Sequence, residues 1–176
     1  MLTKTQTVAK LTGVVLIALI LQSSVFDALR IRHVHPDLLL LVSVLAGLAG
    51  GPEKGVLVGF GAGLLTDLVL TTTTPLGLSA AAFCIAGFAA GLLANLVIRT
   101  TWFITPLVAT TFSALGVGLF AGIGALIGQQ SLVRAHLLTI GAVVSVANGI
   151  ISLACWRPIV WAARTESPVR RPLGLR

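Results

Sequence analysis

The sequence predicts an all-α protein, a polytopic membrane bundle of six transmembrane helices. Three observations lead to this prediction: 56% of the 176 residues are hydrophobic, only 10% are charged, and the mean hydropathy is +1.04. Soluble domains carry about a quarter of their residues as charged side chains. A chain this apolar is typical of membrane proteins in which apolar runs cover most of the length.

Six apolar segments can be marked along the chain. A helix needs about 20 residues to cross about 30 Å of hydrocarbon, and four of the segments are long enough. The other two are short, so we expect them to thin the bilayer, to be shielded by neighbouring helices, or to form a re-entrant pair. In order, the segments are 8–26, 37–50 (short), 54–70 (short), 76–98, 102–128 and 132–160.

The apolar run from Leu11 to Leu21 follows Lys4 and Lys10, but no cleavage site of small residues comes after it, so we expect an uncleaved span rather than a signal peptide. The basic residues predict the orientation, because cytoplasmic loops of membrane proteins are enriched in Lys and Arg. With a cytoplasmic N-terminus and six crossings, nine basic residues lie inside and three outside. The inside set is Lys4, Lys10, Lys54, Arg99, Arg157, Arg164, Arg170, Arg171 and Arg176, and the outside set is Arg30, Arg32 and Arg134.

Both termini are therefore expected in the cytoplasm. Residues 1–163 are predicted to form one transmembrane domain, and residues 164–176 a disordered basic tail at the cytoplasmic surface. The net charge of +7 reflects this orientation, and no nucleic-acid partner is expected because the charges are scattered between apolar spans. Membrane lipid is the expected surrounding and partner of the bundle.

The third segment carries a glycine stripe, made of Gly55, Gly59 and Gly63, which ends at Asp67. A spacing of four residues places all four along one slowly drifting line of a helix. Each interior glycine costs a helix in water about 1 kcal/mol against alanine, whereas in lipid it lets a second helix approach closely. We therefore predict that the stripe is a surface for helix packing or for a partner, covered by protein and not by lipid.

Asp67 has three possible roles: a structural hydrogen bond inside the bundle, a contact with a partner protein, or ion or proton transport. A carboxylate facing lipid inside the membrane costs on the order of 3 kcal/mol or more, so it should face protein. A structural role is favoured, because no second membrane carboxylate accompanies Asp67 and a proton relay normally needs one.

Other polar residues give weaker signals. His33, His35 and Asp37 could ligate a metal, but two alternating histidines favour a solvated loop. The in-span amides of Gln22, Asn95 and Asn148 are expected to bond across helices, with a small-molecule pocket as the alternative. Cys84 and Cys155 are expected to be small core residues, and neither a nucleophile motif nor a phosphate-binding loop is present. The sequence thus predicts no enzyme, metal or cofactor.

Four stretches together resemble the bacterial rod shape-determining protein MreD family. They are Gln22-Ser-Ser, Pro36-Asp37-Leu-Leu-Leu-Leu-Val, Gly59-Phe-x-x-Gly63-Leu-Leu-x-Asp67-Leu and Pro75-Leu-Gly77-Leu-Ser. The resemblance covers roughly residues 20–95, while the last two segments match only in hydropathy and length. It adds Pro36, Asp37 and Gly77 to the packing or partner surface.

This resemblance implies a non-catalytic scaffold of the cell-elongation complex in the bacterial inner membrane. It implies direct binding to the single-span protein MreC, and we expect the span of MreC, or the base of its outer domain, on the glycine-lined surface. Through that complex it implies an association with MreB, with RodA and with its transpeptidase, a class B penicillin-binding protein. The fold is expected to be similar to the substrate-binding subunits of energy-coupling-factor transporters. That likeness supplies the alternative function, a small-molecule-binding subunit of a vitamin importer, which predicts an enclosed pocket.

Overall fold

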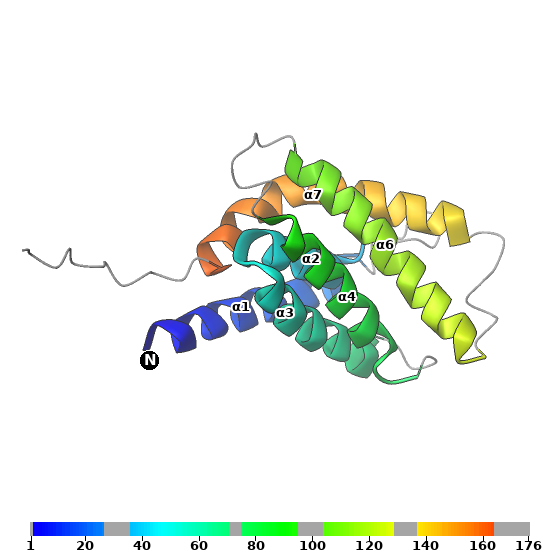
Figure 1. Ribbon diagram of the computed structural model, residues 1–176, viewed down its shortest axis with the longest axis horizontal. Helices are drawn as coiled ribbons and strands as arrows, with labels where there is room; N and C mark the ends of the chain where they lie inside the picture. The colour runs from blue at the N-terminus through cyan, green and yellow to red at the C-terminus, as the bar shows by residue number, and fades with distance from the viewer. Residues whose placement is uncertain (1, 27–35, 71–74, 95–103, 129–136, 164–176) are drawn as a thin grey trace, which may run out of the picture.

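The computed structural model describes residues 2–26, 36–70, 75–94, 104–128 and 137–163, and within these ranges every regular element is helical (Figure 1). Three of the helical stretches are long and apolar enough to cross a membrane, namely Thr5–Ser24, Ile104–Leu126 and Thr139–Ala163. The helices are α1 (Leu2–Leu21), α2 (Leu38–Gly50), α3 (Pro52–Leu65), α4 (Leu78–Leu92), α6 (Ile104–Leu126) and α7 (Leu137–Ala163), with π-helical turns η1 (Gln22–Phe26) after α1 and η2 (Thr66–Leu70) after α3.

The predicted segment bounds differ from the observed ones mainly at the helix starts. The first helix begins at Leu2, ahead of the predicted start at residue 8, and the last ends at Ala163, beyond residue 160. The fourth begins at Leu78 because a turn with Gly77 in the left-handed conformation (φ 95°) precedes it. The expected loop histidines, Asn95 and the basic tail 164–176 lie outside the described residues.

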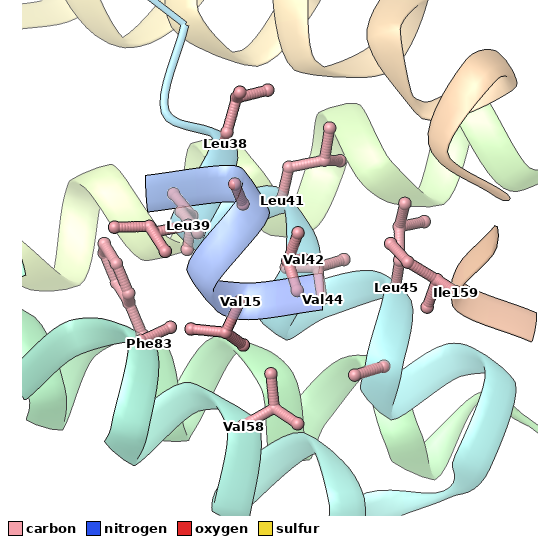
Figure 2. Close-up of a cluster of buried hydrophobic side chains, with 14 of the residues drawn as sticks. Val15, Leu38, Leu39, Leu41, Val42, Val44, Leu45, Val58, Phe83 and Ile159 are labelled. Atoms are coloured by element: carbon pink, nitrogen blue, oxygen red, sulfur yellow. The ribbon is translucent and has the colours of Figure 1, made fainter. Parts of the chain in front are cut away.

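Helix α2 is the centre of the bundle. It contacts α1, α3, α4, α6 and α7, and every residue from Leu38 to Leu48 is buried. A helix that is apolar on all sides buries all of its sides, and the sequence of α2 has no polar face. Figure 2 shows side chains from four other helices around those of α2; the labelled ones are Leu38, Leu39, Leu41, Val42, Val44 and Leu45 of α2 with Val15, Val58, Phe83 and Ile159.

The short length of α2 is explained by this position. Its 13 residues extend about 20 Å, less than the hydrocarbon thickness of about 30 Å. A helix end at membrane depth is tolerated only where protein surrounds it. Of the expectations for the two short segments, shielding by neighbouring helices is the one that the packing of α2 matches.

The start of α1, the start of α3 and the end of α7 lie at one end of the molecule. The Lys54 side chain near the start of α3 donates a hydrogen bond to the carbonyl oxygen of Ala163, the last residue of α7. The ammonium of Lys10 in α1 stands 4.6 Å from the ring centroid of Trp161 in α7. Figure 1 shows the first helix beginning and the last helix ending on the same side.

Candidate functional site

The glycine stripe of α3 lies against α4, and the two helices run side by side with their backbones in contact (Figure 1). A Cβ atom at Gly59 would stand 2.5 Å from the carbonyl oxygen of Phe83, and one at Gly63 would stand 2.5 Å from the amide nitrogen of Ala80. Such distances leave no room for a methyl group, so α3 can approach α4 this closely only with glycine at these positions.

The contact is reciprocal, because α4 presents its own glycines to α3 and α2. A Cβ atom at Gly87 would stand 2.6 Å from the carbonyl oxygen of Gly55, and one at Gly91 would stand 2.5 Å from Pro52. Gly47 of α2 faces the carbonyl group of Gly87 in the same way. Three helices therefore meet around Gly87 with almost no side chains between them.

The stripe is covered by the chain itself. The sequence left open whether another helix of the bundle or a partner protein would lie on it, and we expected the span of MreC, or the base of its outer domain, on this surface. Helix α4 occupies the surface, so the stripe is not open for a partner's helix. The pattern of one small residue in four identified a close helix contact without identifying which helix makes it.

Asp67 lies at the end of the stripe in η2 and is 2% exposed. Its carboxylate accepts hydrogen bonds from the backbone N–H of Gly77 at 2.7 Å and from that of Ser79 at 3.2 Å. Gly77 is the N-cap of α4 and Ser79 lies in its first turn, where backbone N–H groups have no partner within the helix. Asp67 therefore caps α4 from another element, and its negative charge is favourable at a helix N-terminus.

Gly77 is required at the start of α4 by its backbone conformation. Its φ angle of 95° is in the region that residues with a Cβ atom rarely adopt, although no atom would contact an added Cβ within 4 Å. This conformation points the Gly77 N–H at Asp67. The Asp67–Gly77 pair thus fixes the connection between η2 and α4.

Asp37 caps the start of α2, as Asp67 caps the start of α4. Its side chain accepts a hydrogen bond from the Leu40 N–H at 3.0 Å, and the Gln22 side chain in η1 accepts one from the Leu39 N–H at 3.1 Å. Pro36 precedes this N-cap and is partly buried. These caps satisfy backbone N–H groups of the first turn of α2, which have no partner within the helix.

Asn148 connects this helix start to α6 and α7. It is fully buried, and its amide nitrogen donates to the carbonyl oxygen of Asp37 and to the hydroxyl of Ser113, both at 3.1 Å. Its amide oxygen is buried and has no hydrogen-bond partner among the residues that the structure describes. Gln22, Asp37, Ser113 and Asn148 form a polar cluster that joins η1, α2, α6 and α7.

Asn148→Leu is expected to destabilise the bundle by about 1 kcal/mol, because the two lost donor contacts outweigh the removal of one unpaired oxygen. Thermal unfolding of the purified protein in detergent measures this. Ile150→Val on the exposed face of the same helix is the matched control and should leave the midpoint unchanged. An unfolding midpoint of Asn148→Leu equal to that of the wild type would show that the polar cluster contributes no stability.

Helix α6 carries a second line of small residues, and this line is open. An added Cβ atom at Gly118 or Gly122 would meet no atom within 4 Å. These residues lie in the α6 groove, a shallow and largely open apolar strip formed by α6 alone among the described residues and lined by Ala114, Leu115, Gly118, Leu119, Gly122, Ile123 and Leu126. The groove is open to the outside, so it differs from the enclosed pocket that the importer alternative predicts.

The glycines of α6 lie on two different faces of the helix. Gly116 faces Leu40 of α2, whereas Gly118 and Gly122 face away from the bundle. Helical periodicity could have distinguished these two sets, though not which of them is covered. Among the residues that the structure describes, no group of three or more His, Cys, Asp or Glu side chains could hold a metal ion.

The comparisons with known proteins add one result. A family model described as rod shape-determining protein MreD matches residues 4–160 of the chain, which includes α6 and most of α7. No curated protein and no solved structure matches the chain.

Proposed function

The chain belongs to the rod shape-determining MreD family, and from this we propose that it is a non-enzymatic scaffold of the bacterial cell-elongation complex that binds MreC directly. In this role it helps to position peptidoglycan synthesis, with MreB, RodA and a class B penicillin-binding protein reached through the complex. The buried polar groups support a structural role, because Asp37, Asp67 and Asn148 bond to helix ends and neighbouring helices.

We also propose that all six helices cross the inner membrane, with residues 1–163 as one domain and both termini in the cytoplasm. The contact of Lys10 with Trp161 supports an even number of crossings, since it brings α1 and the end of α7 to one side. The hydrogen bond of Lys54 to Ala163 places the start of α3 on the same side. The proposed likeness to the substrate-binding subunits of energy-coupling-factor transporters is supported only by the all-helical architecture.

The α6 groove is the surface that we assign to the MreC span. Glycine at an exposed helix position costs about 1 kcal/mol against alanine and gains nothing from lipid contact. A second helix that packs on Gly118 and Gly122 regains this through close backbone contact. The open side of these two glycines is the single observation that carries this assignment, because the stripe of α3 is already covered.

Replacing both Gly118 and Gly122 by Leu is expected to reduce recovery of MreC by about tenfold or more in detergent co-purification, since two isobutyl groups keep the helices apart. The fold should survive, because both positions face open space. Gly61→Leu is the matched control: Gly61 of α3 also has open space around its Cβ position.

Thermal unfolding of each variant without MreC separates binding from folding. The docking site is wrong if the doubly substituted protein unfolds like the wild type and still recovers MreC in full. Equal losses of MreC in this variant and in Gly61→Leu would also contradict it, since the effect would not be specific to α6.

A further inference from the structure

Two basic side chains and one tryptophan share a surface at the end of the bundle where α1 starts and α7 ends. The Lys10 ammonium stands over the Trp161 ring at 4.6 Å from its centroid. Arg157 precedes Trp161 by four residues in α7, which places both on the same face of the helix. We call Lys10, Arg157 and Trp161 the basic–aromatic face.

This face is open and its charge is not neutralised by the bundle. Trp161 is 61% exposed, and Arg157 is exposed as well. The carboxylates of Asp37 and Asp67 cap helix starts elsewhere, and Glu53 is exposed near the start of α3. Within the described ranges, no carboxylate forms an ion pair with Lys10 or Arg157.

Arg157 lies close enough to the end of α7 for the face to reach the lipid headgroups. Helix α7 has 27 residues and extends about 40 Å, longer than the hydrocarbon layer of about 30 Å. Arg157 and Trp161 lie in its last two turns, before the helix ends at Ala163. Tryptophan is enriched at this depth because its ring is apolar and its N–H is polar.

We propose that the basic–aromatic face binds the phosphate group of an anionic phospholipid at this membrane surface. Arg157 supplies planar N–H donors for phosphate oxygens, and Lys10 supplies a second cation across the Trp161 ring. The site uses residues of α1 and α7, shares no residue with the α6 groove, and does not depend on MreC.

The test is native mass spectrometry of the delipidated protein, titrated with phosphatidylglycerol and, separately, with phosphatidylcholine. Each basic residue near an anionic membrane surface strengthens lipid binding by about fivefold. Losing two should therefore weaken phosphatidylglycerol binding by about 30-fold. The doubly substituted Lys10→Gln, Arg157→Gln protein should show this loss for phosphatidylglycerol and little change for phosphatidylcholine. The charge-keeping pair Lys10→Arg, Arg157→Lys should retain binding of phosphatidylglycerol.

Inorganic phosphate and glycerophosphoglycerol, added as competitors, distinguish a lipid from a free phosphate compound. A lipid site keeps its phosphatidylglycerol when either is present in excess, because neither carries acyl chains. Displacement of the lipid by inorganic phosphate would overturn the proposal, as would unchanged phosphatidylglycerol binding in a folded variant that lacks both charges.

Folding is checked by thermal unfolding in an uncharged detergent. If the double substitution lowers the midpoint, Arg157→Gln alone replaces it, because exposed Arg157 bonds to none of the described residues. This single variant should weaken phosphatidylglycerol binding by about fivefold. Binding equal to that of the wild type would contradict the proposal.

Discussion

Gly63→Leu is expected to prevent the stable folding of the bundle. The Cβ position of Gly63 is 2.5 Å from the amide nitrogen of Ala80 and 2.6 Å from the carbonyl carbon of Ser79. These are backbone atoms of α4, which cannot rotate away as the end of a flexible side chain can. Leucine must therefore force α3 and α4 apart, at a cost of about 3 kcal/mol or more. Fluorescence-detected size exclusion after heating measures the expected loss of folded protein.

The matched control is Gly61→Leu, two residues earlier on the same helix. No atom would lie within 4 Å of its Cβ position, so this variant should remain folded. Gly59→Ala provides a milder form of the test, because its Cβ atom would stand 2.5 Å from the Phe83 carbonyl oxygen. A Gly63→Leu protein as stable as Gly61→Leu would show that α3 and α4 are not packed as described here.

Asp67→Ala is expected to destabilise the protein by about 2–4 kcal/mol. It removes the acceptor for the backbone N–H groups of Gly77 and Ser79, and a buried donor without a partner costs about 1–3 kcal/mol. The first turn of α4 should open, which hydrogen–deuterium exchange over residues 77–80 measures together with the unfolding midpoint.

Asp67→Asn should lie between the wild type and Asp67→Ala, because the amide keeps one acceptor oxygen but loses the negative charge at the helix N-terminus. Glu53→Gln is the matched control, since Glu53 is an exposed carboxylate in the first turn of α3. If Asp67→Ala shows exchange and stability equal to those of Glu53→Gln, Asp67 does not cap α4.

Asp37 and Asp67 both cap the start of a short helix. Helices α2 and α4 have 13 and 15 residues, so each is shorter than the hydrocarbon layer is thick. Their first backbone N–H groups have no partner within the helix, and Asp37 and Asp67 accept hydrogen bonds from such groups. Each carboxylate thus binds backbone N–H groups at a helix start, which supports the structural role that the sequence favoured for Asp67.

Several features could be predicted from local sequence. The apolar run of α2 predicted a helical segment, and its lack of a polar face accounts for its burial. The four-residue spacing predicted that Gly55, Gly59, Gly63 and Asp67 share a line on one helix. The amides of Gln22 and Asn148 were expected to bond across helices, and the structure shows them doing so through Asp37 and Ser113.

Other features could not be predicted, because they depend on segments far apart in the chain. Lys54 bonds to Ala163, which is 109 residues away, and Asn148 bonds to Asp37, which is 111 residues away. No sequence pattern around Lys54 or Asn148 indicates which residue it bonds to.

By itself the sequence determined a membrane class, the helical segments and the residues that share a face, because composition and a period of 3.6 residues are local properties. Only the tertiary structure decided which face is covered. The glycine lines of α3 and α6 have the same four-residue spacing, yet α4 covers one and leaves the other open. Contact between helices depends on how the whole chain packs, and a local period carries no information about that.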